Sequence, residues 1–216
     1  MAMETELKVR VDDPETLRTR LSALGLYLGA CEKDDAYWRF PAPEAPSAGA
    51  DGPPKIPPPG LRVRRERNVR DGDSVSEKVL VTWKTGKLDG GVEINDEREF
   101  DVSNGELFED LLERLGLEPG IRKNKKGWIW DCPSEEGPIR AELLNVRGLG
   151  WFLELEITED AEGTGKAGPQ WEERLRERLF SLLEKLEIPR GRMESRPYTR
   201  MLLENREDTL SRNASF

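Results

Sequence analysis

The stretch Glu4-Thr5-Glu6-Leu7-Lys8-Val9-Arg10-Val11 sets a pattern that the rest of the chain repeats. Because side chains alternate across a β-strand, its two glutamates and two cations share one face, and its aliphatic residues share the other. At a rise of about 3.3 Å per residue, Glu4 and Glu6 lie close enough to bind one divalent ion. Lys8 and Arg10 follow on the same face, where they suit the anion that such a metal carries. A half-buried strand with a solvated charged face would show the same pattern, so its recurrence along the chain decides the interpretation.

The bulk composition suits one domain with a charged surface or a polar interior. The chain has 216 residues, a net charge of −9 and 36% charged residues. A chain this acidic is a poor candidate for binding nucleic acid or an anionic membrane, and it has no apolar run long enough for a membrane span. We find no signal-peptide pattern, and Cys31 and Cys132 make neither a disulfide framework nor a zinc site, so we expect a cytoplasmic protein.

The chain contains no histidine. This absence excludes Ser-His-Asp and Cys-His catalysis and a zinc site with histidine ligands. A metal would therefore be held mainly by oxygen atoms, which points to Mg²⁺, Mn²⁺ or Ca²⁺.

Alternation of polar and apolar residues predicts about eight strands. They cover residues 4–11, 26–40, 61–68, 77–84, 93–102, 121–130, 139–146 and 151–157. Helical periodicity predicts helices over 14–24, 104–115 and 171–186 and a short helix over 198–203. For the second helix, Ser103 with Glu106 suggests a capping box. Its apolar stripe comprises Leu107, Phe108, Leu111, Leu112 and Leu115.

Two segments differ from the rest in composition. Residues 41–60 are rich in Pro, Ala and Gly and cannot hold a strand ladder, so we expect a long surface loop inserted in the domain. A proline-rich ligand for a partner domain is the alternative interpretation of this segment. Residues 205–216 form a polar C-terminal tail, which leaves 1–204 as the single domain.

The predicted fold is α+β, an eight-stranded antiparallel β-barrel with a charged interior and flanking helices. Most strands carry charge on one face and aliphatic residues on the other, and the amphipathic helices need an apolar partner. If the apolar faces of the strands point outward, the helices can pack on them. The charged faces of the strands then point inward and line a tunnel. Unpaired charges are costly to bury. A polyanion would neutralise the basic side chains of the tunnel, and metal ions bound with it would neutralise the acidic ones.

A set of motifs in this order resembles the CYTH superfamily, the triphosphate tunnel metalloenzymes. The ExExK signature stands at Glu4–Lys8. The other matching segments are Asp35–Tyr37, Leu61–Arg64, Thr82–Lys84, Glu97–Glu99, Leu149–Glu156 and Pro197–Tyr198. A lone ExExK is a weak signal, whereas the ordered set covers nearly the whole chain.

This resemblance implies a role for each matching position. Divalent metal would be held by Glu4, Glu6, Glu142, Glu154 and Glu156. Phosphate oxygens would be bound by Lys8, Arg10, Arg62, Arg64, Lys84, Lys123 and Lys125. Glu97, Glu99 and Lys84 would be catalytic, the two glutamates by positioning a second metal or the attacking water, although either glutamate could simply pair with neighbouring cations.

The sequence departs from the family pattern in three places. The family often has an Asp where Leu144 stands, and Glu142 is the candidate substitute on the same face. The basic strand reads either Lys123-x-Lys125 or Asn124-x-Lys126, which leaves its register open. The adenylyl-cyclase branch often has a His before its acidic motif, and this chain has none.

The resemblance implies an enzyme that uses Mg²⁺ or Mn²⁺ and acts on a small triphosphate-containing molecule, as a monomer or homodimer. We expect hydrolysis of inorganic triphosphate or of an organic triphosphate such as thiamine triphosphate or a nucleotide. The alternative is a class IV adenylyl cyclase, which uses the same pocket to convert ATP to cyclic AMP and pyrophosphate. A third interpretation is a non-catalytic polyphosphate-binding module.

Overall fold

The computed structural model describes residues 2–41, 61–70, 74–160 and 168–213. The predicted Pro-rich loop, apart from residue 41, lies outside the described residues, so that prediction stays open.

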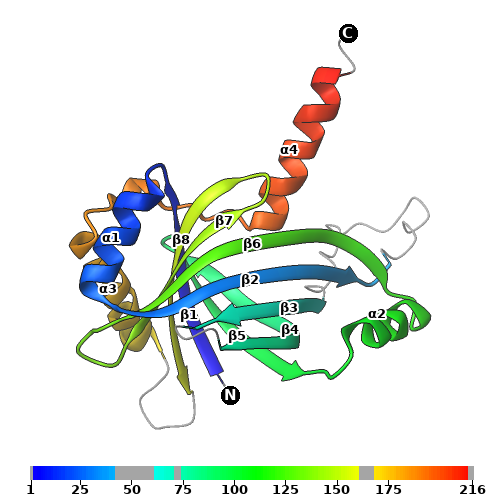
Figure 1. Ribbon diagram of the computed structural model, residues 1–216, viewed down its shortest axis with the longest axis horizontal. Coiled ribbons are helices and arrows are strands. Elements are labelled where there is room, and N and C mark those ends of the chain that lie inside the picture. Colours follow the sequence, from blue (N-terminus) through cyan, green and yellow to red (C-terminus); the bar gives the residue numbers. More distant parts are fainter. Residues whose placement is uncertain (1, 42–60, 71–73, 161–167, 214–216) are drawn as a thin grey trace.

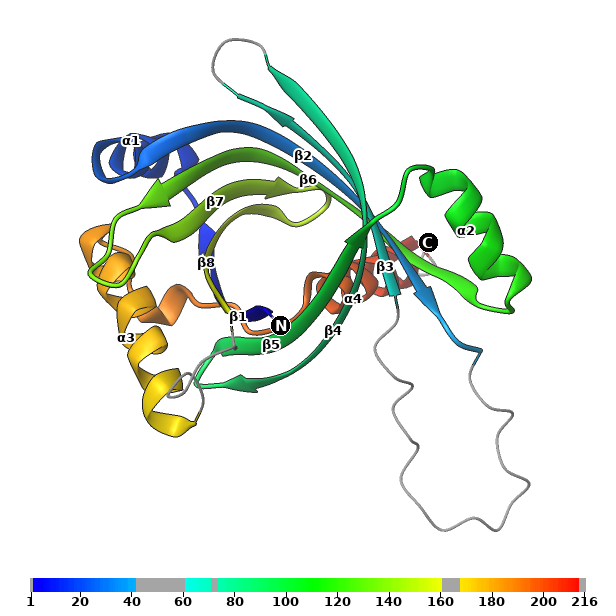
Figure 2. The same cartoon turned by 90° about the horizontal axis from the view of Figure 1, so that it is seen from below.

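Eight antiparallel strands close into one barrel (Figures 1 and 2), which confirms the predicted fold. The strands are β1 (Ala2–Val11), β2 (Leu26–Arg39), β3 (Leu61–Val69), β4 (Val75–Asp89), β5 (Val92–Asp101), β6 (Glu118–Cys132), β7 (Ile139–Val146) and β8 (Gly150–Asp160). Around the barrel they follow the order β1-β5-β4-β3-β2-β6-β7-β8, and β8 pairs back to β1. Closure leaves the barrel with two faces, an interior and an exterior.

The helices of the described chain lie outside the barrel. They are α1 (Pro14–Leu24), α2 (Gly105–Arg114), α3 (Pro169–Lys185) and α4 (Tyr198–Asn213), with a 3₁₀ turn at Arg190–Arg192. Figures 1 and 2 show α1 and α3 on one side of the barrel and α2 on the opposite side, whereas α4 projects away from it. The last helix continues to Asn213, beyond the short helix expected over 198–203. Within the described residues, no helix combines the length and apolar character needed to cross a membrane.

The main hydrophobic core lies between the exterior of the barrel and helices α1 and α3. Leu7 and Val9 of β1 and Leu153 of β8 are fully buried there. They pack with Leu21 of α1 and Leu179 of α3. The aliphatic face of each of these strands therefore points outward, as predicted, and leaves the charged face inside.

The N-terminus of α2 lies one residue later than expected. Asn104, not Ser103, is the cap, and its Oδ1 accepts a hydrogen bond from the backbone N–H of Leu107 at 3.0 Å. An asparagine cap satisfies an otherwise unpaired donor of the first turn as well as a serine does. The prediction was wrong because two adjacent residues both suit the cap position.

Helix α2 is attached through a narrow inward face, in which Phe108 also packs against the barrel. Leu112 is buried, and the Glu109 carboxylate binds Arg65 of β3 at 2.6 Å and Arg122 of β6 at 2.9 Å. Most of the expected apolar stripe is instead exposed, namely Leu107, Leu111 and Leu115. The buried face of α2 is thus narrower than its sequence periodicity predicts.

The segment after α3 returns to the first strand. Met193 forms an isolated bridge with Val9, and the backbone N–H of Glu194 donates to the carbonyl oxygen of Lys8 at 2.9 Å. This attachment brings Tyr198, the first residue of α4, against the lysines of the barrel interior.

Candidate active site

The barrel interior encloses a cavity of about 900 Å³. Residues at alternate positions of the strands line it, because only every second side chain points inward. All the predicted site residues except Arg10 are among the lining residues, namely Glu4, Glu6, Lys8, Arg62, Arg64, Lys84, Glu97, Glu99, Lys123, Lys125, Glu142, Glu154 and Glu156.

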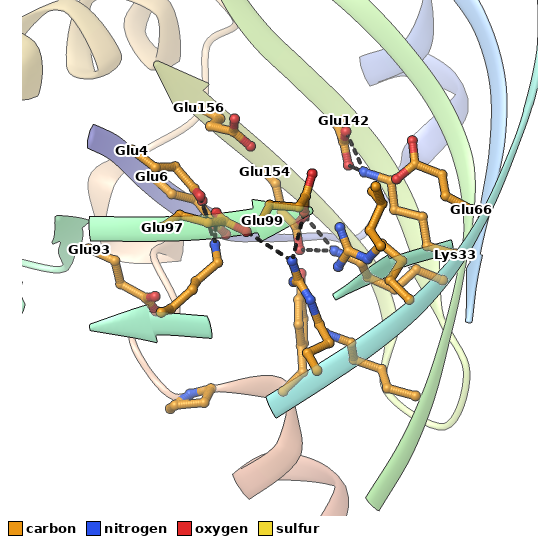
Figure 3. A pocket seen from close by; sticks show the side chains of 18 of the residues that line it. Glu4, Glu6, Lys33, Glu66, Glu93, Glu97, Glu99, Glu142, Glu154 and Glu156 are labelled. Atoms are coloured by element: carbon orange, nitrogen blue, oxygen red, sulfur yellow. Dashed lines mark hydrogen bonds and ion pairs between the residues drawn. The ribbon is translucent and has the colours of Figure 1, made fainter. Parts of the chain in front are cut away.

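The cavity has two walls of opposite charge. We call Glu4, Glu6, Glu97 and Glu156, which come from β1, β5 and β8, the acidic wall. We call Lys33, Arg62, Arg64, Lys123 and Lys125, which come from β2, β3 and β6, the basic wall. The two sets of strands are separated around the barrel by β4 and β7. Figure 3 shows the glutamates of the acidic wall facing Lys33 across the cavity.

Strand pairing assembles the acidic wall. Glu6 lies opposite Glu156 in the ladder between β1 and β8, and Glu4 precedes Glu6 by two residues on the same face. Directly opposed strand residues have Cβ atoms about 5 Å apart, so these carboxylates crowd one another. The crowding sets up strong repulsion unless a cation lies between the carboxylates.

A lysine provides such a cation in this structure. The Nζ atom of Lys84 lies 2.8 Å from both carboxylate oxygens of Glu4 and 2.8 Å from Oε2 of Glu97. Glu97 also accepts a hydrogen bond from Nη2 of Arg62 at 3.0 Å. Among the described residues, no three His, Cys, Asp or Glu side chains converge as a ready-made metal site.

Two carboxyl groups of the acidic wall, those of Glu97 and Glu156, have a raised pKa. Burial, together with the Glu99 and Glu156 carboxylates, raises the pKa of Glu97 to about 8 despite the nearby Arg62 and Lys84. Burial, Glu142 and Glu6 likewise raise the pKa of Glu156. A divalent cation would relieve this repulsion, and carboxylate oxygens are the ligands that Mg²⁺ and Mn²⁺ prefer. The donor chemistry of the wall therefore fits the metal that the family resemblance implies.

The basic wall is held by carboxylates and a phenol. Arg64 makes a two-pronged contact with Asp35, through Nε at 2.7 Å and Nη2 at 3.0 Å. The Nζ of Lys123 lies 3.0 Å from Asp35 and donates to the hydroxyl of Tyr37 at 3.0 Å. Although burial opposes it, the Lys123 and Arg64 cations keep the pKa of Asp35 well below its usual range. These contacts fix the side chains before any ligand arrives.

The register of the basic strand is now resolved. Lys123 and Lys125 are buried in the cavity. Lys126 is exposed and pairs with Glu32, which also accepts a hydrogen bond from Asn124. Of the two readings of this strand, Lys123-x-Lys125 is therefore the one that faces the tunnel.

Two of the predicted metal ligands are held by lysines. Both oxygens of Glu142 lie 2.6 Å from Nζ of Lys33. The carboxylate of Glu154 accepts hydrogen bonds from Lys125 at 2.8 and 3.1 Å. The structure thus brings Glu4, Glu6 and Glu156 together and places Glu142 and Glu154 in ion pairs with lysines.

Arg10 does not line the cavity. Its guanidinium binds the Glu194 carboxylate at 3.0 and 3.1 Å and lies over the ring of Phe152. Alternation places Arg10 on the inward face of β1, but the segment after α3 covers that end of the strand and supplies the pairing acid. Sequence periodicity could not reveal this partner, which lies 184 residues further along the chain.

Several cavity residues were absent from the predicted set, Lys33 and Tyr198 among them. Lys33 could have been found, because it precedes Asp35 by two residues and therefore shares its inward face. Tyr198 closes one end, where its ring lies 5.1–5.6 Å from the ammonium groups of Lys8, Lys123 and Lys125. In the sequence, Tyr198 could be linked to the tunnel only through the Pro197–Tyr198 motif of the family, because no strand alternation places it there.

The comparisons with known proteins support the fold. No family model matches the sequence, and no curated protein matches it. The structure is similar to the PH1819 protein of Pyrococcus horikoshii OT3, with a TM-score of 0.67 and 21% identity over 93% of this chain and 98% of the other. It is also similar to a candidate adenylate cyclase of Vibrio parahaemolyticus, with a TM-score of 0.65 and 18% identity over 93% and 97% of the two chains.

A plant protein has a more distant structure. HpAC1 from Hippeastrum, a candidate adenylyl cyclase described as having a dominant triphosphatase activity, matches with a TM-score of 0.54 and 16% identity over 91% of each chain. At these identities the comparisons establish the architecture. The chain therefore shares the fold of these proteins, and its architecture is the closed eight-stranded antiparallel barrel expected from the sequence.

Proposed function

We propose that this chain is a CYTH-type, divalent-metal-dependent triphosphatase that cleaves a phosphoanhydride bond of inorganic triphosphate or of an organic triphosphate. One observation carries the proposal, namely the acidic wall facing the basic wall across the cavity inside the barrel. Phosphoryl transfer needs charge neutralisation and alignment more than covalent chemistry. A linear polyanion with bound cations complements both walls at once, and the description of HpAC1 agrees with such a reaction.

The basic wall would hold the phosphate chain. Arg62 and Arg64 present guanidinium groups that suit phosphate oxygens in pairs, and Lys123 and Lys125 add point charges to the same cavity. Arg64, Lys123 and Lys125 are buried and Arg62 is partly buried, so their interaction with a developing negative charge is stronger than in water.

On the acidic wall, Glu4, Glu6 and Glu156, with Glu97, would hold the divalent ion. When bound, such an ion polarises a phosphoryl oxygen and lowers the pKa of a coordinated water. Glu97 would in addition help to position the attacking water, as the family resemblance implies for this residue or for Glu99. Glu99 lies next along β5 and accepts a hydrogen bond from Thr82 at 3.0 Å, which would orient it toward the same water.

The alternative is a class IV adenylyl cyclase. The Vibrio neighbour is described as a candidate adenylate cyclase, and such an enzyme would use the same two walls while the ribose hydroxyl attacks the α-phosphate. A non-catalytic polyphosphate-binding module is the third candidate.

A substrate panel separates the three functions. Purified protein is incubated with Mg²⁺ or Mn²⁺ and inorganic triphosphate, ATP or thiamine triphosphate, and both phosphate and cyclic AMP are measured. We expect phosphate release. Cyclic AMP with pyrophosphate from ATP would favour the cyclase, and tight binding without turnover would favour the binding module.

Substitution of the acidic wall provides the first mutational prediction. Glu4→Gln and Glu156→Gln should each lower phosphate release by about 100-fold or more, because each removes a carboxylate that would hold the metal, and the metal would neutralise the negative charge of the transition state. Glu113→Gln, on the exposed side of α2, is the matched control and should leave the rate unchanged. Full activity in both cavity variants would rule out the proposed metal site.

A further inference from the structure

A second cavity lies on the outside of the barrel, and none of the residues that line the interior cavity contributes to it. Its volume of about 540 Å³ is within the range of cavities that bind small molecules. It crosses strands β3, β2, β6, β7 and β8, which lie side by side in the barrel (Figure 1). We call it the exterior groove and define it by six of its lining residues, Ala30, Lys126, Trp128, Asn145, Arg147 and Trp151.

The strand register produces this groove. Ala30 of β2 lies between Val69 of β3 and Trp128 of β6 in the ladder. Because a methyl group stands between two larger side chains, the surface has space for a ligand at this point. In the adjacent row, Asn145 of β7 lies directly opposite Trp151 of β8. An aromatic residue from each of the two strands that flank β7 therefore borders the groove.

The two indoles form a fixed aromatic surface. The rings of Trp128 and Trp151 are stacked, with centroids 5.5 Å apart and an angle of 4° between their planes. Both side chains also pack against the main hydrophobic core, and the guanidinium of Arg18 of α1 lies 4.3 Å from the centroid of the Trp128 ring. These contacts hold the rings in place before any ligand arrives.

Positive charge surrounds this aromatic surface. Among the described residues that line the groove, three are cations and one is a carboxylate, although the whole chain carries a net charge of −9. The ammonium of Lys126 lies 2.7 Å from Glu32, which also accepts a hydrogen bond from Asn124. Arg147 is exposed and has no ion-pair partner in the described part of the chain, and the side-chain amide of Asn145 has no hydrogen-bond partner there. The groove thus offers a free guanidinium and a free amide beside two indoles.

We propose that the exterior groove binds a nucleotide, with its base against the indoles of Trp128 and Trp151 and its phosphate at Arg147 and Lys126. Each nucleobase has a flat π-face that stacks on aromatic side chains, whichever base it is. Guanidinium and ammonium groups bind phosphate oxygens, and the amide of Asn145 can both donate to and accept from the edge of a base.

A nucleotide matches this combination better than an isolated anion or an uncharged ring does. Inorganic phosphate would pair with the cations and leave the indoles in contact with water. An uncharged ring would cover the indoles and leave Arg147 without a partner. The groove lies outside the tunnel and needs neither metal nor triphosphate, so this inference goes beyond the proposed function and is tested separately from it.

The test measures binding of nucleoside monophosphates, which lack the triphosphate chain on which the proposed function depends. Calorimetry without added metal compares a purine and a pyrimidine nucleotide, AMP and UMP, with adenosine and with inorganic phosphate. We expect both nucleotides to bind. Adenosine and inorganic phosphate should bind at least about 10-fold more weakly than AMP, because each lacks one of the two groups that the groove contacts.

Photocrosslinking locates the bound nucleotide in the wild-type protein. The probe is 8-azido-AMP, and mass spectrometry identifies the modified residues. We expect the label on Trp128 or Trp151. Labelling of Tyr37 or Tyr198 instead, both of which line the interior cavity, would place the nucleotide in the tunnel and overturn the inference.

Two variants test the contacts separately. Arg147→Glu should weaken AMP binding by about 10-fold or more, because it replaces an unpaired cation by an anion. Trp151→Leu should weaken it by about 10-fold, because it removes half of the aromatic surface. The matched control is Lys185→Glu, an exposed residue of the last turn of α3 with the same change of charge, and it should give the wild-type affinity.

Three further results would overturn the inference. Absence of binding of both nucleotides would show that the groove is not a nucleotide site, while leaving the proposed triphosphatase intact. Equal affinities for AMP and inorganic phosphate would show a general anion site without base recognition. Equal affinities of Arg147→Glu and Lys185→Glu for AMP would show that the phosphate does not bind at Arg147. The wild-type crosslink decides the location even if a variant fails to fold.

Discussion

At the scale of single residues, Glu97 shows how the surroundings of a carboxyl group change its chemistry. Burial and the neighbouring Glu99 and Glu156 carboxylates raise its pKa from 4.5 to about 8. Between these two values the folded protein binds a proton that the unfolded chain releases. The free energy of unfolding therefore falls as pH rises through this window, by up to about 1.4 kcal/mol per pH unit for one group.

Replacing Glu97 by glutamine should remove this dependence. Glu97→Gln keeps the shape of the side chain and cannot ionise, so its stability should change less between pH 5 and pH 8 than that of the wild type. Urea unfolding at a series of pH values measures the difference. Glu113→Gln should retain the wild-type slope, and an identical slope in Glu97→Gln would show that another group titrates in this window.

At the scale of elements, α2 shows that a helix can be amphipathic without burying its whole apolar stripe. Its sequence places leucines on one face, yet the barrel contacts mainly Leu112 and the ion pairs of Glu109 with Arg65 and Arg122. The buried face of α2 is therefore a narrow strip, and the other side of its apolar stripe is exposed.

Two adjacent leucines of α2 should therefore respond differently to truncation. Leu112→Ala removes a side chain that is 3% exposed and should lower the free energy of unfolding by about 2–5 kcal/mol. Leu111→Ala removes a side chain that is 47% exposed and should change it by about 0.5 kcal/mol or less. Denaturant unfolding compares the two, and equal losses would mean that the outer side of α2 is covered in solution.

At the scale of the whole molecule, ion pairs inside the barrel connect strands that are not neighbours. Lys33 of β2 and Glu142 of β7 meet across β6, and both side chains are less than 10% exposed. A buried pair of this kind adds little net stability over an apolar pair, but loss of one partner leaves an uncompensated charge.

A double-mutant cycle tests this pair. Lys33→Met alone should lower the free energy of unfolding by about 3–5 kcal/mol, and the double variant Lys33→Met, Glu142→Leu should recover most of the loss. Lys126→Met, which breaks the exposed pair with Glu32 on the outside of the same sheet, should cost about 1 kcal/mol or less. Additive effects of the two cavity substitutions would show that Lys33 and Glu142 do not act as a pair.

Much of the barrel could be predicted from local pattern. The alternation of Glu4, Glu6 and Lys8 with aliphatic residues predicted which side chains face inward, and the same argument applied to β4, β5 and β8. It could not predict the cap at Asn104 or the exposed leucines of α2, because adjacent residues of similar type compete for the cap and helical periodicity does not show how much of an apolar stripe other elements cover. For Arg10, alternation indicated the correct face of β1, and a distant acid, Glu194, then determined its position.

The sequence by itself determined which residue types enter the tunnel, because inward and outward positions follow from a period of two and are independent of strand order. Only the tertiary structure decided which cation meets which carboxylate. Lys84 and Glu4 are 80 residues apart, and Lys33 and Glu142 are 109 residues apart. Such pairs form only once the strands have closed into the barrel in one particular order. Their Coulomb energy depends on the distance between the charges and on their exposure to solvent. The local sequence pattern determines neither the distance nor the exposure.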